Sequence, residues 1–460
     1  MTASIRGRGG LWLAILLCVP FAGAAFAEPR PAGTPWLVHS EWVKADEDFL
    51  AGDALSGRGS ATNDEAIAAA YIESQFESFG LVPAPGMRSF GQSANIVRFV
   101  LGREPLLEIA GRPVAGLVLL TAPPGEVRGR LVVAASDDPA AMPDGGIIAI
   151  GSTKAGFLPL AHAASLRHVR LLIAPQNADT DRLRRQMGGE TRMPVYLEGE
   201  TPDAMAIAIL PQAEFDRIVG QAGQQVSLTL PAMTLSRSTT SNAIGFLPGT
   251  DPNAGLLLLS AHLDHLGRLP DGTIMHGADD DASGATAVLE LARALAAGPR
   301  SRRGIVFVCY GSEETGGFGS RYFAAHPPVP LSRIAANIEF EMIGAQDPKL
   351  PAGTLMMTGF ERSSLGETLA AHGALVTSDP YPDQHFFERS DNYQLALKGV
   401  VAHTISGWAV TPVYHQPTDT IENLDIPFMT RAIQSLIEPV RWLAESRKDP
   451  QWKNGGQPQH

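Results

Sequence analysis

The chain of 460 residues contains little cysteine, and only Cys18 and Cys309 are present. A framework of disulfide bonds is therefore excluded, so the fold must be stabilised by packing or by bound metal. Apolar residues make up 44% of the chain and charged residues 18%. This balance is typical of a globular protein with buried cores rather than of a disordered one.

Long apolar runs are also scarce. The first run lies near the N-terminus and is shorter than a membrane-spanning helix. Arg6 and Arg8 precede the apolar stretch 11–21, which is too short to cross a bilayer comfortably. Small residues follow it and end in an A-x-A pattern at Ala27, which is typical of a signal-peptide cleavage site. We therefore expect residues 1–27 to be a signal peptide of a secreted or periplasmic bacterial protein, with no stable membrane insertion after cleavage.

Positive charge is in deficit. The 36 Lys and Arg face 48 Asp and Glu, which gives a formal net charge of −12. Removal of residues 1–27 would take away two arginines and no acidic residue, so the mature chain would be more acidic still. A net negative charge disfavours contact with phosphate backbones, and nucleic acid is not expected as a partner.

The chain divides into regions of different patterning. Residues 28–100 contain two helical stretches that we assign to the first part of the main domain. Residues 101–235 consist of short β-type runs separated by turns, which predicts an inserted β-rich module. Residues 236–445 alternate strands and helices, which predicts a mixed, mostly parallel central sheet flanked by helices, an α/β fold. Residues 446–460 form a polar tail that we expect to fray.

Five polar sequences follow or end the expected strands of the last domain. They read "AHLDHLG", "GADDDASG", "EETGGFGS", "EFEMIG" and "YHQPTDT". Each alone could be a solvated loop or a structural histidine. Open α/β sheets bind their ligands at the carboxyl ends of the strands, so five such sequences in succession favour a metal site there.

The first sequence supplies a metal-ligand type with an orienting partner. His262 ends a continuous apolar run, and Asp264 points to the same side because side chains alternate along a strand. A carboxylate beside a histidine fixes its tautomer and orients it toward a metal. His265 points to the other side and is interpreted as a structural histidine.

Acidic residues dominate the next sequences. Three aspartates, 279–281, precede a helix and could merely favour its N-terminal dipole, but their position after His262 suits a ligand that bridges two divalent ions. Glu313 and Glu314 are adjacent and splay apart, so one can bind metal while the other acts as a general base.

The last two sequences extend the set of candidate ligands. Glu339 and Glu341 lie on one side of an apolar strand, where a charge is costly unless it is paired or bound to metal. His415 lies in a loop that contains proline, with Asp419 nearby as an orienting group.

Together these sequences resemble the motifs of the dizinc exopeptidase family that includes bacterial leucyl aminopeptidases, glutamate carboxypeptidase and the transferrin receptor ectodomain. The resemblance covers residues 236–425, with a weaker match in the helix "AAAYIESQFESFG". The segment "GGIIAIGSTKAGFLPLAHAASLRHVRLLIAPQN" is similar to the protease-associated module of some members. One departure is Glu341, because many members have aspartate there.

The resemblance implies a ligand set for two zinc ions, which Co²⁺ or Mn²⁺ could replace. One ion would be bound by His262, Asp279 and Glu341, and the other by Asp279, Glu314 and His415. Asp279 would bridge the two ions, with a cis peptide between Asp279 and Asp280. Glu313 would be the general base, and Asp264 the partner of His262.

The implied activity is that of an aminopeptidase, which removes N-terminal residues from peptide substrates. A carboxypeptidase-type member is an alternative and needs a basic side chain for the substrate carboxylate. Arg389 is a candidate for that role, unless it pairs with Asp391 or Glu388. A non-catalytic receptor or scaffold on the same fold, or a one-zinc glutaminyl cyclase, is disfavoured because all five ligands and the base are present.

Overall fold

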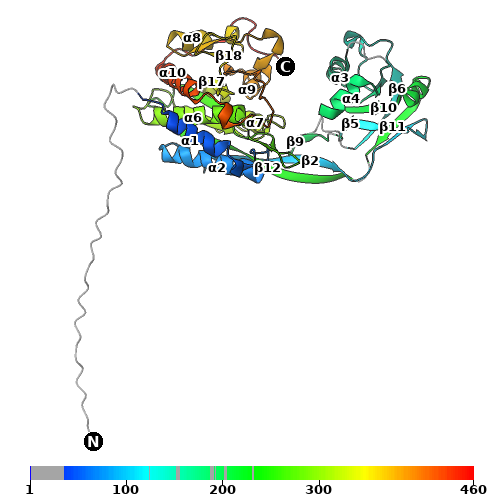
Figure 1. Ribbon diagram of the computed structural model, residues 1–460, viewed down its shortest axis with the longest axis horizontal. Coiled ribbons are helices and arrows are strands. Elements are labelled where there is room, and N and C mark those ends of the chain that lie inside the picture. The colour runs from blue at the N-terminus through cyan, green and yellow to red at the C-terminus, as the bar shows by residue number, and fades with distance from the viewer. Residues whose placement is uncertain are drawn as a thin grey trace.

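The computed structural model describes Met1 and residues 36–459, apart from residues 124, 152–155, 187–190, 192, 201–204 and 231–232. The expected signal peptide therefore lies outside the described residues, apart from Met1. The described strands form a ten-stranded sheet, an eight-stranded sheet and a two-stranded sheet. Figure 1 shows the two large sheets in separate bodies, joined by the long strands β2 (Gly91–Leu101) and β12 (Met233–Leu247). We call the body with the ten-stranded sheet the larger body and the other the inserted module.

The ten-stranded sheet has the order β19-β18-β20-β17-β13-β16-β12-β2-β9, with β1 paired to β12. Its central strands run parallel: β20 (Ala402–Ser406), β17 (Ile334–Glu341), β13 (Leu256–His262) and β16 (Ile305–Tyr310). Antiparallel pairs join β12, β2 and β9 (Val195–Leu197) on one side. On the other side β18 (Leu355–Met357) pairs antiparallel with β20 and parallel with β19 (Val376–Ser378). The short β1 (Val82–Pro83) completes the sheet.

Helices cover both faces of this sheet, which is why its central strands are buried along almost their whole length. One face packs against α1 (Ser40–Leu50), α2 (Asn63–Ser78), α6 (Gly284–Ala296), α8 (Leu365–Ala371) and α10 (Ile426–Glu445). The other face packs against α7 (Phe318–Ala325) and α9 (Asn392–Leu397). The predicted α/β architecture, with a mixed sheet flanked by helices, is confirmed. Among the described helices, none has both the length and the hydropathy to cross a membrane.

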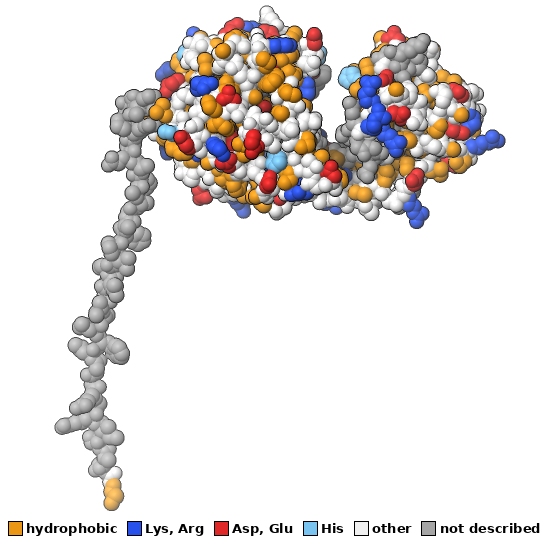
Figure 2. All heavy atoms as spheres, viewed as in Figure 1, with side chains coloured by type: hydrophobic (Ala, Val, Ile, Leu, Met, Phe, Trp, Pro, Cys, Tyr) orange, Lys and Arg blue, Asp and Glu red, His pale blue; other side chains and the backbone are white. Residues whose placement is uncertain are grey.

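The inserted module has a sheet of its own between residues 106 and 229. Its order is β4-β3-β11-β6-β7-β8-β10-β5. The strands are β3 (Leu106–Ile109), β4 (Arg112–Pro113), β5 (Val118–Thr121), β6 (Glu126–Val133), β7 (Ile147–Ala149), β8 (Leu171–Pro175), β10 (Ala206–Leu210) and β11 (Gln225–Thr229). The helices are α3 (Phe157–Leu166), α4 (Ala178–Gln186) and α5 (Gln212–Val219). Figure 2 shows a deep gap between the module and the larger body on the visible face.

The C-terminal tail differs from the expectation that it frays. Trp452 donates a hydrogen bond from Nε1 to the carbonyl of Gly399 at 3.1 Å, and its ring lies against Phe387 and His403. An indole buries apolar area and also needs a partner for its N–H, and this site offers both. The described part of the tail is therefore docked on the larger body.

Candidate metal centre

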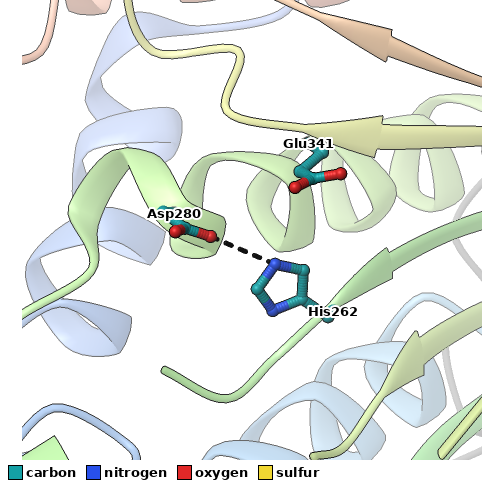
Figure 3. Close-up of side chains that lie close together, drawn as sticks. All are labelled: His262, Asp280 and Glu341. Carbon is teal, nitrogen blue, oxygen red and sulfur yellow. Dashed lines mark ion pairs between the residues drawn. The ribbon is translucent and has the colours of Figure 1, made fainter. Parts of the chain in front are cut away.

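The first part of the site lies where two neighbouring parallel strands end. His262 is the last residue of β13 and Glu341 the last residue of β17. Asp280 comes from the segment that leads into α6. Figure 3 shows the three side chains pointing toward one another, and one candidate ligand atom of each lies within 4.8 Å of the other two. Nε2 of His262 is 3.2 Å from Oδ1 of Asp280.

The second part of the site lies on the other side of the same aspartate. Nε2 of His415 is 3.2 Å from Oδ2 of Asp280 and 3.1 Å from Oε2 of Glu314. His265 also belongs here, since its Nδ1 lies 2.7 Å from Oε1 of Glu314, and His265, Asp280 and Glu314 form a group that could hold a metal ion. The two oxygens of Asp280 thus face two different clusters.

These separations fit the demands of metal binding. Ligand atoms about 2.0–2.1 Å from one tetrahedral zinc lie about 3.3 Å apart, close to the observed 3.1 and 3.2 Å. Nε2 of His262 and Oδ2 of Asp280 are buried, and neither makes a hydrogen bond within the described structure. Burial alone would raise the pKa of Asp280, but the contacts with His262 and His415 hold it below its ordinary value. The donor set therefore fits two divalent ions that share Asp280.

The structure places Asp280, rather than the expected Asp279, between the two groups of candidate ligands. Asp279 was expected there, but its Oδ1 accepts a hydrogen bond from the N–H of Gly344 at 2.8 Å, in the loop after β17. The cis peptide joins Asp280 to Asp281 rather than Asp279 to Asp280. The reason lies in the backbone. Asp280 has φ −110° and ψ 93°, which are non-helical torsions, and its side chain therefore turns toward the strand ends.

The third aspartate has a structural task. Oδ1 of Asp281 accepts hydrogen bonds from the N–H groups of Gly284 at 2.9 Å and Met342 at 3.0 Å. Its Oδ2 accepts from the N–H of His262 at 3.2 Å. Asp281 therefore ties the start of α6 to the ends of β13 and β17, and three successive aspartates perform three different tasks.

Asp264 holds more than the histidine that the sequence suggested. Nδ1 of His262 lies 3.2 Å from the backbone carbonyl of Asp264 and 3.8 Å from its carboxylate, so the closer contact is to the backbone. The carboxylate accepts hydrogen bonds from the N–H of Glu313 at 2.8 Å, from the N–H of Glu314 at 3.4 Å and from the hydroxyl of Ser60 at 2.5 Å. Asp264 therefore fixes the turn that carries both glutamates.

Glu313 remains outside both ligand groups. Burial raises the pKa of its carboxyl well above the ordinary value, an effect that the nearby His262 opposes and the nearby Glu341 reinforces. A general base works best when its pKa lies near the operating pH. Glu339 also lies outside these groups, because its Oε2 accepts from the hydroxyl of Thr404 at 2.7 Å and from the N–H of Asn392 at 2.8 Å.

Asp419 supports the site through the backbone. Its two carboxylate oxygens accept hydrogen bonds from the N–H groups of Asp279 at 2.8 Å and Asp280 at 3.1 Å. The sequence suggested that Asp419 orients His415. These two hydrogen bonds instead hold the loop that presents the Asp280 carboxylate.

Arg58 is a supporting residue that sequence reasoning missed. Its guanidinium is fully buried and donates to the carbonyls of Leu263 at 2.9 Å, His276 at 2.8 Å and Gly277 at 2.7 Å, and to that of Leu50 at 2.5 Å. The carbonyls of Leu263, His276 and Gly277 belong to the segments that carry His262 and Asp280, and that of Leu50 ends α1. A lone arginine between glycines gave no signal of this role, because its partners are far away in the sequence.

A small pocket opens beside Glu341. Its lining includes the apolar side chains of Met342, Met356 and Phe386, and also Arg389. The Arg389 guanidinium lies 5.0 Å from the centre of the Phe386 ring. Arg389 thus stacks on an aromatic ring instead of pairing with the acidic residues that follow or precede it in sequence.

Comparison with known proteins finds relatives among the peptidases. Residues 242–439 match the model of Peptidase family M28. The chain is 36% identical over 122 residues to leupeptin-inactivating enzyme 1 of Streptomyces exfoliatus, which covers 26% of each protein. It is 32% identical over 240 residues to aminopeptidase YwaD of Bacillus subtilis, which covers 49% of this chain and 50% of that one. The matches thus span about a quarter and a half of these relatives.

A solved structure shows that the fold is shared over most of the chain. The structure of BSAP, a zinc aminopeptidase from Bacillus subtilis, superposes with a TM-score of 0.52 at 20% identity. It covers 88% of this chain and 94% of that one. These findings confirm the resemblance that the sequence motifs indicated.

Proposed function

We propose that the chain is a zinc-dependent exopeptidase of the aminopeptidase type. The premise is the match of residues 242–439 to the model of peptidase family M28. The observation that carries this proposal is the two-sided environment of Asp280. One of its oxygens faces His262, in a group that Glu341 completes. The other faces His415, which also contacts Glu314. The names of YwaD and BSAP support an aminopeptidase, and that of BSAP also supports zinc.

The residues of this chain would hold two zinc ions and move a proton. When bound, such a pair supplies a Lewis acid for the scissile carbonyl and lowers the pKa of water. The Glu313 carboxylate takes a proton from the attacking water, whose oxygen bonds to the carbonyl carbon. When the C–N bond breaks, Glu313 returns that proton to the leaving nitrogen. Asp264 keeps Glu313 and Glu314 in place through their backbone N–H groups.

The pocket beside Glu341 suits the side chain of the residue to be removed. Met342, Met356 and Phe386 would pack against an apolar side chain beside Glu341, and the rest of the lining includes the polar Thr358, Thr404 and Ser406. Arg389 in the same lining gives the carboxypeptidase-type alternative a specific basis, because a guanidinium binds a carboxylate well.

The test is a Glu313→Gln variant assayed on two kinds of substrate. With aminoacyl-nitroanilides, we expect kcat to fall by about 10²–10⁴-fold, the usual contribution of a general base, while bound zinc stays near the wild-type amount. Chelation should abolish wild-type activity and added zinc should restore it.

Two results would contradict the proposal. Unchanged turnover in the Gln variant would remove Glu313 from its role. A wild-type preference for N-blocked peptides over aminoacyl-nitroanilides would replace the aminopeptidase by the carboxypeptidase-type alternative.

A further inference from the structure

His265 is a fully buried histidine whose neighbours belong to the metal centre. Its Nδ1 lies 2.7 Å from Oε1 of Glu314 and 3.8 Å from Oδ2 of Asp280. Within the described residues, neither ring nitrogen makes a hydrogen bond, and neither does Oε1 of Glu314, so the 2.7 Å approach is a charge contact without hydrogen-bond geometry. A buried imidazole without a partner is costly, so this contact is the interaction that accounts for the ring.

The two oxygens of Glu314 have different surroundings. Oε2 lies 3.1 Å from Nε2 of His415, on the side of the shared aspartate, whereas Oε1 faces His265. The terminal torsion of a glutamate is broad, so a carboxylate bound through one oxygen can rotate unless the other oxygen is held. His265 supplies that second contact.

The imidazole itself has little room to turn. A Cβ on Gly277 would lie 2.4 Å from Cγ of His265, so the ring packs directly against the Gly277 backbone. The ring of His415 meets it edge-on at 5.7 Å between centroids. The backbone N–H of His265 donates to the carbonyl of Arg58 at 3.0 Å. The ring therefore presents Nδ1 to Glu314 in a fixed direction.

We propose that His265 is a positioning residue for the second zinc, which holds Glu314 by Oε1 so that Oε2 is presented with His415 and Asp280. This inference rests on the proposed two-zinc function and assigns His265 no bond to the metal. The short segment 262–265 would then have three roles. His262 would be a ligand, Asp264 would fix the turn that carries Glu313 and Glu314, and His265 would orient the side chain of Glu314.

The test compares His265→Ala, His265→Asn and His403→Asn in the zinc-loaded full-length protein. The amide nitrogen of asparagine can donate from nearly the position of Nδ1. His403 is equally buried, but its nitrogens contact Ser363 and the carbonyl of Thr358, outside both ligand groups. It therefore controls for the loss of a buried ring.

Zinc release to a chelator of known affinity gives the readout. We expect the alanine variant to bind one of its two zinc ions about 10- to 100-fold more weakly, as is usual when an outer-shell partner is lost. The asparagine variant should recover most of this affinity, and His403→Asn should match wild type. The visible spectrum of the cobalt-substituted protein should be the same in His265→Asn and wild type, because the ligand set is unchanged.

Two results would overturn the inference. Wild-type zinc affinity in His265→Ala would leave the ring with a packing role only. Equal loss in the alanine and asparagine variants, with a changed cobalt spectrum, would make His265 a direct ligand. A wild-type protein that binds fewer than two zinc ions would instead contradict the proposed function itself.

Discussion

The larger body and the inserted module both contain buried parallel strands, but the residues at the ends of these strands differ. In the larger body β13 and β17 end at His262 and Glu341, and both belong to the candidate metal centre. In the module β7, β8 and β10 are equally buried but end at Ala149, Pro175 and Leu210. Parallel strands thus create a place for ligands, and only the residues at their ends decide whether chemistry occurs there.

The electrostatics of the two regions differ in the same way. Burial raises the pKa of Asp279 and Asp281 well above the ordinary value. In and near the module the shifts go the other way, because Asn95 and Arg237 lower the pKa of the exposed Glu198, and Arg217 lowers that of Glu214. Asp279 and Asp281 of the larger body are therefore carboxyl groups whose charge is disfavoured by burial, whereas Glu198 and Glu214 are stabilised as carboxylates by their partners.

The sharpest way to break this comparison is to exchange neighbouring aspartates for asparagine. We expect Asp280→Asn to lower kcat/KM by more than about 10²-fold and to reduce bound zinc, because losing a shared ligand should exceed the 10–100-fold effect of an outer-shell change. Asp279→Asn should change kcat/KM by less than about tenfold, since its amide oxygen still accepts from Gly344. Metal content and aminoacyl-nitroanilide kinetics measure both effects.

This pair also checks the one-residue correction directly. If Asp279→Asn removed zinc and Asp280→Asn did not, the shared carboxylate would be Asp279 after all.

A second prediction compares buried and exposed arginines. Arg58→Met should lower the free energy of unfolding by about 3–5 kcal/mol, because it leaves several buried carbonyls without a donor. Arg182→Met, in the module, should cost less than about 1 kcal/mol. Its side chain is 66% exposed and pairs with Asp179 on the same helix at 3.3 Å. Urea denaturation followed by circular dichroism gives both values. Equal losses would mean that Arg58 does not hold the loops of the site.

The sequence was sufficient to predict the α/β sheet and most of the residues that gather at its edge. Apolar strands such as β13 and the polar residues that end them are local patterns, and their common edge follows from parallel pairing. Which of three aspartates is shared could not be predicted, because it depends on the backbone torsions at Asp280. If the expected assignment is shifted by one residue in such a segment, each aspartate is given the role of its neighbour.

Two supporting residues were beyond sequence reasoning for a related reason. Arg58 donates to a carbonyl 219 positions away, and no local pattern reveals such a partner. His265 was assigned to the opposite side from His262 by strand alternation. However, β13 ends at His262, so that periodicity no longer applies to His265.

The smallest expected effect concerns pH. Burial lowers the pKa of His403, in β20 of the larger body, from 6.5 to about 4. The folded state therefore keeps His403 neutral, while the unfolded chain takes up a proton below pH 6.5. Stability from this residue is complete above pH 6.5 and is lost as the pH falls toward 4, by about 3 kcal/mol. His403→Asn should remove this part of the acid sensitivity. The measured quantity is the difference in unfolding free energy between the variant and wild type at each pH. The effect of zinc release cancels in this difference because it is common to both proteins. His162→Asn in the module replaces an exposed histidine and should leave the wild-type curve unchanged. If it flattened the curve as much as His403→Asn, the acid sensitivity would not come from the buried ring, and the two regions would not differ in this respect.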